Sequence, residues 1–135
     1  MKILVFDCSK FGYELDHSTG VGEEAHVGDK ENFVDCLVIF VTFEKSDSES
    51  SLEKATKDMI SLANENKRKL IFINPFAHLS SNLAKPKDAI EMTKLMEKML
   101  STHSNLKVIR GAFGWYKKFD ISINGHDRSQ VFREY

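Results

Sequence analysis

Residues 70–81 read LIFINPFAHLSS and carry the most information about the fold of this chain. Its first four residues, Leu70 to Ile73, form an apolar run with β-branched and aromatic side chains, which predicts a buried strand over 69–74. The chain becomes polar after Pro75, where the block PFAHLSS begins. A kinked polar segment at the end of a buried strand is where folds place groups that contact a ligand. We therefore predict a strand that delivers a ligand-facing segment.

Several other segments have the apolar, β-branched pattern of strands. They are residues 2–7, 12–17, 36–44, 107–109 and 119–123. We expect the second of these to fold back on the first as a hairpin. The residues that follow the hairpin, 18–31, are rich in Gly and acidic side chains and lack periodicity, which predicts a loop.

Two segments have helical periodicity. The first begins with SSLE, residues 50–53, which fits a capping box, and it ends at 67–68. Pro86 suits the first position of the second helix. The apolar faces are Leu52, Ala55, Met59 and Leu62 in the first helix, and Ala89, Met92, Met96 and Met99 in the second. The order of strands and helices predicts an α/β fold of two layers, with a largely antiparallel sheet and two helices.

Composition is that of one soluble domain. The 135 residues suffice for one core, and 29% charged with 41% hydrophobic residues is ordinary for a folded protein. The longest apolar stretch, 36–43, is far too short to span a membrane, so we expect a cytoplasmic protein. Cys8 and Cys36 lack metal-site spacing and are expected to be reduced and buried. We expect no metal or other cofactor.

The net charge of −1 gives no indication of nucleic-acid binding. Any contact with RNA must then come from a local basic patch. The candidates for such a patch are Lys67, Arg68, Lys69, Lys107, Arg110, Lys117 and Lys118.

A second motif, GAFGWYK at residues 111–117, follows the apolar pair Val108-Ile109. The two motifs, in this order and spacing, resemble the N-terminal editing domain of archaeal-type threonyl-tRNA synthetase. That family carries a Pro-[Phe/Tyr]-Ala-His-Leu-Ser-Ser block and later a Pro/Ala-Phe-Gly-[Trp/Tyr]-Tyr-Lys block. The first block continues here through NLAKP, residues 82–86, and the likeness spans nearly the whole chain. The resemblance implies a D-aminoacyl-tRNA deacylase-like fold and a single editing domain over 1–135.

Lys117 is the candidate catalytic residue. It follows Trp115 and Tyr116, and a partly desolvated ammonium holds an ester carbonyl or a bound water more strongly. The resemblance gives Lys117 the same role. It also implies a set of substrate-binding residues, which are Pro75, Ala77, His78, Phe113, Tyr116 and Gln130.

The chain departs from the family pattern at two places. Gln130 stands where relatives commonly have a glutamate, and Gln can hydrogen-bond but cannot act as a base. A gap in the alignment would instead bring Glu134 closer to that position. Residues 7–9 are DCS where relatives often have HSD. Both departures bear on rate and substrate preference more than on fold.

The resemblance implies proofreading hydrolysis of L-serine mis-attached to threonine tRNA. Serine lacks one methyl group of threonine, and such a difference supplies only about 1–3 kcal/mol of discrimination, so a second, hydrolytic site is needed. Water would attack the seryl ester at the terminal adenosine, assisted by its 2′-hydroxyl. The expected partners are the 3′ end of tRNA(Thr) carrying serine, a second copy in a homodimer and, if the chain is part of a longer protein, C-terminal synthetase domains. Two alternatives remain open: a D-aminoacyl-tRNA deacylase and a non-catalytic tRNA-binding module.

Overall fold

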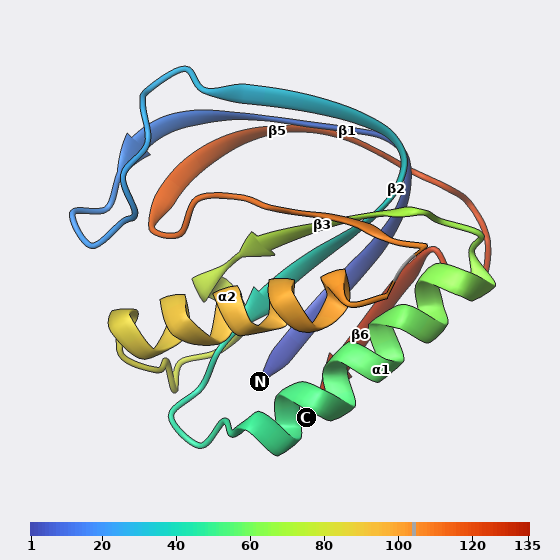
Figure 1. Cartoon of the computed structure of the whole chain (residues 1–135). Coiled ribbons are helices and arrows are strands. Elements are labelled where there is room, and N and C mark those ends of the chain that lie inside the picture. Colours follow the sequence, from blue (N-terminus) through green and yellow to red (C-terminus); the bar gives the residue numbers. More distant parts are fainter. Residues whose placement is uncertain (104) are drawn as a thin grey trace.

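The computed structural model describes residues 1–103 and 105–135, and within them six strands and two helices form two layers (Figure 1). In chain order the elements are β1 (Lys2–Ser18), β2 (Lys30–Thr42), α1 (Glu49–Glu65), β3 (Leu70–Pro75), the 3₁₀ turn η1 (Ala77–Leu79), α2 (Pro86–Ser101), β4 (Lys107–Arg110), β5 (Trp115–Ile123) and β6 (Gln130–Glu134). The strand order is β4-β3-β2-β1-β5, with β6 also paired to β1. Among these pairings, the three made by β1 are antiparallel and the two made by β3 are parallel. The predicted α/β class, with two layers and a largely antiparallel sheet, is confirmed.

The sheet is folded over on itself because β1 and β2 both bend near their middles (Figure 1). At the bend, Asp35 of β2 has a φ of 50°, in the left-handed region that bulky residues rarely adopt. The register of β1 against β5 also shifts between Cys8 and Lys10. A register shift of this kind is typical of a β-bulge, which bends a strand and increases its twist.

The bend divides the sheet into two arms. The helices pack against the covered arm, which contains β3, β4, β6 and residues 2–8 and 36–42 of β1 and β2. The open arm contains β5 and residues 10–18 and 30–34 of the two long strands. The predicted hairpin of 2–7 with 12–17 is therefore wrong. Both segments belong to one bent strand, because β2 is long enough to pair with each of them.

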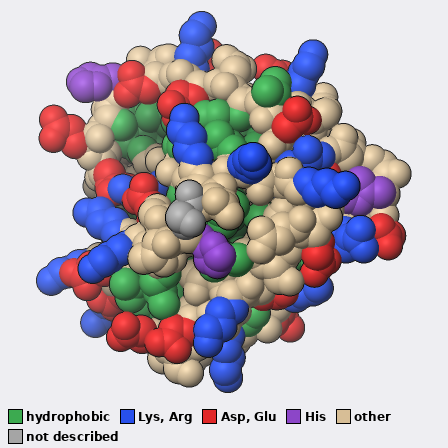
Figure 2. Space-filling model, turned by 45° about the vertical axis from the view of Figure 1, so that its right-hand side comes forward, with side chains coloured by type: hydrophobic (Ala, Val, Ile, Leu, Met, Phe, Trp, Pro, Cys, Tyr) green, Lys and Arg blue, Asp and Glu red, His purple; other side chains and the backbone are tan. Residues whose placement is uncertain are grey.

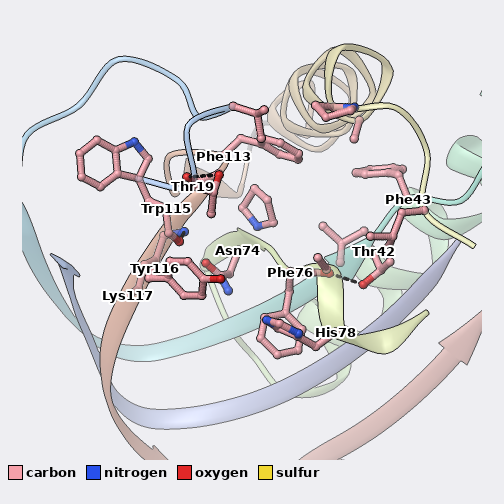
Figure 3. A pocket seen from close by; sticks show the side chains of 18 of the residues that line it. Thr19, Thr42, Phe43, Asn74, Phe76, His78, Phe113, Trp115, Tyr116 and Lys117 are labelled. Atoms are coloured by element: carbon pink, nitrogen blue, oxygen red, sulfur yellow. Dashed lines mark hydrogen bonds between the residues drawn. The ribbon is translucent and has the colours of Figure 1, made fainter. Parts of the chain in front are cut away.

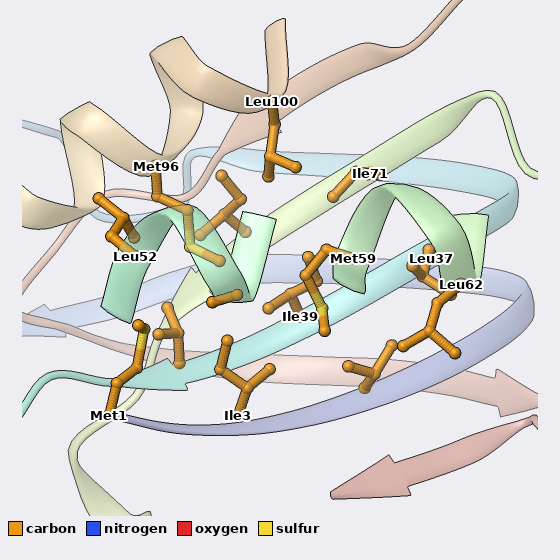
Figure 4. Packing of buried hydrophobic residues seen from close by; sticks show 14 of the residues in the cluster. Met1, Ile3, Leu37, Ile39, Leu52, Met59, Leu62, Ile71, Met96 and Leu100 are labelled. Atoms are coloured by element: carbon orange, nitrogen blue, oxygen red, sulfur yellow. The ribbon is translucent and has the colours of Figure 1, made fainter. Parts of the chain in front are cut away.

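Helices α1 and α2 pack on the outer face of the covered arm (Figure 4). The predicted face of α1 is confirmed, since its four apolar residues are all buried. On α2, Ala89 and Met96 are buried while Met92 and Met99 are partly buried. This first core joins the helices to the sheet through Ile3, Leu37, Ile39, Ile71 and further buried residues of the covered arm.

A second, aromatic core fills the space between the two arms. Phe11 of the open arm packs on Phe72 of the covered arm, with ring centroids 5.0 Å apart. Phe119 packs against Phe40 in the same way at 5.5 Å. Each buried aromatic side chain removes a large apolar area from water, so these contacts hold the arms at a fixed separation.

Several element ends differ from the prediction. The capping box of α1 is formed by Ser48 and Ser51, because each side chain bonds the backbone N–H of the other, at 3.0 and 3.3 Å. β5 begins at Trp115, since the open arm of β1 extends to Ser18 and pairs with it. β6 was not predicted from the sequence. The placement of Pro86 as the first residue of α2 is confirmed.

Cys8 and Cys36 lie opposite each other across β1 and β2, and both are buried free thiols as predicted. Within residues 1–103 and 105–135, no helix is long and apolar enough to cross a membrane.

Candidate functional site

A cavity of about 470 Å³ opens between the arms, near the ends of β2 and β3 (Figure 3). Its walls come from the end of β2, the β3–η1 connection, the start of α2, the loop after β1 and the first residues of β5. Most of the lining side chains are apolar or aromatic, with a few polar groups among them. A concave apolar site of this size with few polar groups is typical of a small-molecule site. In the part of the chain that the structure describes, no cluster of three or more His, Cys, Asp and Glu side chains is arranged to hold a metal ion.

The segment after β3 is fastened along the end of β2. The Phe76 N–H donates to the Val41 carbonyl at 2.9 Å, and the Thr42 hydroxyl donates to the Phe76 carbonyl. Further along, the Ser80 hydroxyl donates to the carboxylate of Glu44. These contacts fix the backbone that carries the PFAHLSS block against the cavity. A rigid backbone is what a site needs if its main-chain groups contact the ligand.

His78 lies on η1 and lines the cavity beside Phe76. Their rings meet edge to face, with centroids 5.0 Å apart. This contact fixes the orientation of the imidazole without using its nitrogens. No hydrogen-bond partner for either ring nitrogen is found in the described part of the chain, so both can face solvent or a ligand.

Lys117 reaches the cavity from the open arm. It pairs with Leu15 of β1, and its ammonium donates to the carbonyls of Ala112 at 2.9 Å and Trp115 at 3.4 Å. An ammonium has three donors, so these two bonds leave the third for a ligand. Burial lowers the pKa of Lys117 to about 8, and the nearby Glu23 carboxylate raises it by a smaller amount. Lys117 is therefore a partly desolvated cation that titrates close to neutral pH.

Lys118, its neighbour, points away from the cavity. Alternation along a strand sends successive side chains to opposite faces. The Lys118 ammonium lies 3.5 Å from Glu14 and 3.3 Å from Asp16 on the surface.

Glu23 ties the loop after β1 to the β4–β5 connection. Its carboxylate accepts hydrogen bonds from the guanidinium of Arg110 and from the Phe113 N–H, the latter at 2.9 Å. Its carbonyl accepts a bond from the Trp115 indole at 2.8 Å. Burial acts to raise the pKa of Glu23, but the bonds from Arg110 and Phe113 outweigh it and leave the pKa lowered. The loop is thus held as a fixed wall of the cavity.

Two glycines allow the close approaches in this region. Gly114 has a φ of 72°, and a Cβ there would lie 2.5 Å from the Gly22 Cα. A Cβ on Gly111 would lie 2.9 Å from the Phe72 ring and 3.4 Å from Cε of Lys117. Gly111 is therefore required by the close approach of the Phe72 ring, and the Lys117 side chain passes beside it at contact distance.

The cavity brings together most of the residues predicted for the site. Its lining includes Lys117, Pro75, Ala77, His78, Phe113 and Tyr116. Gln130 is not part of the lining. It is exposed at the start of β6, where it pairs with Phe6 on the covered arm. Glu134, at the other end of β6, pairs with Lys2 at 3.4 Å and is also away from the cavity.

Sequence reasoning missed Asn74, Thr19 and Phe119, which also line the cavity. Asn74 carried a signal, because a buried amide is unusual at the end of an apolar strand run. Thr19 and Phe119 became site residues only through the bend of the sheet.

Three of the seven basic candidates for an RNA contact are paired with acidic side chains in the structure. Arg68 is bonded to Asp7, Arg110 to Glu23, and Lys118 lies beside Glu14. On the face shown in Figure 2, positive and negative side chains are interspersed, as expected for a net charge of −1.

Three similarities in sequence relate the chain to known proteins. The sequence model of the archaea-specific editing domain of threonyl-tRNA synthetase matches residues 1–135. A threonine–tRNA ligase from Staphylothermus marinus is 40% identical over 133 residues, which are 97% of this chain and 22% of that protein. A threonine–tRNA ligase editing subunit from Saccharolobus solfataricus is 39% identical over 134 residues, or 98% of this chain and 34% of that protein. The chain thus spans about a fifth and about a third of the lengths of these two curated relatives.

A solved structure named c-Myc DNA Unwinding Element Binding Protein shares the fold. It superposes with a TM-score of 0.78 over 100% of this chain and 99% of its own, at 12% sequence identity. Identity this low carries information on fold alone. The superposition confirms the α/β fold class that the sequence predicted.

Proposed function

The chain belongs to the archaea-specific editing-domain family of threonyl-tRNA synthetase, and from this premise we propose that it hydrolyses the ester of L-serine mis-attached to threonine tRNA. On this proposal residues 1–135 form one editing domain that releases free serine and uncharged tRNA. The observation that carries the proposal is one cavity that joins the partly buried ammonium of Lys117 to the turn bearing His78. An ester-cleaving site needs a charged donor in a desolvated space, and this cavity supplies one.

The chemical step is attack of water on the ester carbonyl. Negative charge develops on the carbonyl oxygen, and the free donor of Lys117 stabilises either that oxygen or the attacking water. The 2′-hydroxyl of the terminal adenosine assists the attack. No Asp or Glu is found among the described residues that line the cavity, and on this proposal the substrate's own hydroxyl takes the place of a carboxylate base. Pro75, Ala77, His78, Phe113 and Tyr116 position the aminoacyl group and the adenosine. Gln130 would contribute only if another segment or a second copy carried it to the substrate.

Selectivity follows from size. Val41, Phe43 and Ala89 are apolar residues of the cavity wall, and all three are nearly inaccessible to solvent. A close-fitting apolar wall admits serine and rejects the additional methyl of threonine. A site that attaches the amino acid to tRNA must instead accept threonine, so the two sites select in opposite directions.

The terminal adenosine binds at the rim. The side chain of Tyr116 is 49% exposed and stacks on His17, with ring centroids 4.5 Å apart. An exposed and fixed aromatic face is a platform on which a nucleic-acid base stacks.

The chain also forms a homodimer in this proposal. Phe132 on β6 is 50% exposed, a large apolar side chain available for contact with a second copy. Light scattering that gives the mass of a 15.4 kDa monomer at micromolar concentration would count against this part.

A deacylation assay tests the function. The purified chain is mixed with threonine tRNA carrying L-serine, L-threonine or a D-amino acid, and release of each amino acid is followed. We expect rapid loss of serine with threonine largely spared. Release of the D-amino acid alone would establish a D-aminoacyl-tRNA deacylase. No release of any of them at stoichiometric enzyme would leave a tRNA-binding module.

A further inference from the structure

Asn74 has a buried polar atom that its own chain leaves unpaired. The residue is 1% exposed, and no hydrogen-bond partner for its Oδ1 exists among the described residues. Buried side-chain polar atoms in native proteins nearly always have a hydrogen-bond partner, so an unpaired one indicates a place for a ligand or an ordered water. Asn74 lines the cavity, so the missing partner can come from what the cavity binds.

The alternation of β3 aims this amide into the cavity. Ile71 and Ile73 face the helices, where they join the first core. Phe72 faces the other way, into the aromatic core between the arms. Asn74 is two residues after Phe72, so its side chain points to the same face of the sheet as that of Phe72. It is the last residue before Pro75, and Figure 3 shows its amide among the cavity side chains.

The other groups in the cavity restrict what this amide can bind. Lys117 supplies a cation, and the described lining residues include no Asp or Glu. An aminoacyl ester brings its own cation, the α-ammonium, next to its carbonyl. If the carbonyl faces Lys117, the α-ammonium must point away from that charge and needs an acceptor. The Asn74 carbonyl oxygen is such an acceptor, and it is neutral.

A neutral acceptor suits the site better than a carboxylate would. A carboxylate at position 74 would share the cavity with Lys117 and attract its free donor. An amide accepts a bond from the α-ammonium without competing for the lysine. We propose that Oδ1 of Asn74 accepts a hydrogen bond from the α-ammonium of the aminoacyl group and so orients the ester toward Lys117. This inference rests on the proposed function and deepens it.

The test measures binding, which does not depend on turnover. The ligands are amides of 3′-amino-3′-deoxyadenosine, which the enzyme cannot hydrolyse as esters. One carries serine, a second carries 3-hydroxypropanoic acid, which lacks only the α-amino group, and a third carries alanine, which lacks only the hydroxyl. Titration calorimetry at pH 6.5, where the α-amino group is charged, gives each dissociation constant.

The variants are Asn74→Leu, Asn74→Asp and the control Asn66→Ala. Asn66 has the other unpaired buried amide atom in the described chain, but it lies at the end of α1 and outside the cavity. We expect Asn74→Leu to weaken the seryl and alanyl amides about ten- to a hundredfold, the value of a hydrogen bond to a charged group, and to leave the hydroxypropanoyl amide unchanged. Asn74→Asp keeps an acceptor and should bind the seryl amide far better than Asn74→Leu. Asn66→Ala should bind all three like the unmodified chain.

Three outcomes overturn the inference. They are equal binding of the seryl amide by Asn74→Leu and the unmodified chain, equal weakening of the seryl and hydroxypropanoyl amides, and weakening of the seryl amide without the alanyl one. If the unmodified chain hydrolyses seryl-tRNA(Thr) and any of these is found, the proposed function stands and only the inference fails. If the unmodified chain neither binds the amides nor hydrolyses the ester, the proposed function fails and the inference with it. If it binds the amides without hydrolysing the ester, only the function fails and the binding series decides the inference. Thermal melting confirms that each variant is folded.

Discussion

Lys117 and Pro75 line the same cavity although they lie on opposite arms of one sheet. Lys117 pairs with Leu15 of β1, while Pro75 pairs with Val41, which in turn pairs with Ile3 of β1. Along a straight strand, the stretch from residue 3 to residue 15 would separate them by roughly 40 Å at about 3.3 Å per residue. The bend in β1 and β2 removes that separation. The site thus depends on the bend as much as on the two motifs.

Replacing Lys117 with Met tests the proposed catalytic role. Met keeps most of the side-chain stem and removes the charge, so packing is retained while the positioned donor is lost. We expect the rate of seryl-tRNA(Thr) hydrolysis to fall about 10²–10³-fold, which is typical for loss of one such donor. The measurement is single-turnover release of serine.

Lys118→Met is the matched control. Lys118 is exposed and faces Glu14 and Asp16 on the surface, so its loss should leave the rate nearly unchanged. Equal activity of Lys117→Met and the unmodified chain, with circular dichroism showing both folded, would make Lys117 a structural residue and the site assignment wrong.

The pKa of Lys117 predicts a pH dependence of the reaction. With a pKa of about 8, the side chain carries its proton and donates below that pH, and it loses the proton above it. Spontaneous ester hydrolysis rises with pH, so the informative quantity is the rate of the unmodified chain divided by that of Lys117→Met. This ratio should fall as the pH rises through about 8. A ratio that rises instead would indicate that the neutral amine acts as a base.

The same pKa predicts an effect on stability. The ordinary pKa of 10.5 applies to the unfolded chain, so between about 8 and 10.5 the unfolded state binds more protons and the free energy of unfolding rises with pH. Below pH 8 the cost of the buried charge is fully present. We therefore expect Lys117→Met to melt at a higher temperature than the unmodified chain at pH 7, and the difference to shrink at pH 10. A lower melting temperature at pH 7 would show that the lost bonds to Ala112 and Trp115 outweigh the burial of charge.

The sequence predicted much of the fold because most elements have local signals. The buried run before Pro75, the apolar face of α1 and the position of Pro86 all follow from periodicity and residue type. β6 had no such signal. Its residues are mostly exposed, and it forms because it pairs with residues 2–6 of β1. Pairing of this kind is a property of the tertiary structure and is invisible in a short window of sequence.

The site was predicted through motifs, and the structure shows what motifs omit. The residues of the two blocks converge on one cavity, but Gln130 was placed by alignment alone and lies on another edge of the sheet. The bend that joins the blocks depends on an Asp35 with positive φ, a conformation that residue type does not specify. The prediction of a hairpin failed for the same reason, since a bend and a turn look alike in a hydrophobic pattern.

Asp7 should be essential to the stability of the bend. Its carboxylate is buried and bonds the guanidinium of Arg68, the Asn124 amide at 2.8 Å and the His126 ring at 2.8 Å. Burial acts to raise the pKa of Asp7, but these bonds outweigh it and lower the pKa to about 2. Asp7→Ala leaves Arg68 without its buried partner, and such losses cost about 3–5 kcal/mol of the free energy of unfolding. Urea unfolding at pH 7 measures the change.

The dependence of the free energy of unfolding on acidic pH provides a second test of the role of Asp7. Its folded pKa lies below the ordinary 3.8, so its contribution is complete above about pH 4 and is lost as the pH falls toward 2. The stability difference between the unmodified chain and Asp7→Ala should shrink over that range. As a control, Arg128→Ala removes an exposed pair with Glu65 at 3.7 Å and should cost less than about 1 kcal/mol. Similar losses in the free energy of unfolding for the two variants would mean that Asp7 does not stabilise the bend.

Gly111 tests whether the position of Lys117, and not only its charge, is needed. A methyl group at position 111 would lie 2.9 Å from the Phe72 ring and 3.4 Å from Cε of Lys117. Phe72 is fully buried between the arms and has little room to move, so the clash with its ring displaces the backbone at residue 111. That displacement moves the backbone and the new methyl group against the Lys117 side chain, which already lies in contact distance. Displacement of a catalytic group by about 1 Å can cost up to about 10²-fold in rate, and we expect Gly111→Ala to lower the rate of serine release about ten- to a hundredfold. The matched control is Gly125→Ala, because a methyl group there meets no described atom within 4 Å and should leave the rate unchanged. Measuring both rates at pH 7 beside thermal melts separates displacement from unfolding. If Gly111→Ala is folded and as active as Gly125→Ala, the path of the Lys117 side chain past residue 111 is not a requirement of the reaction.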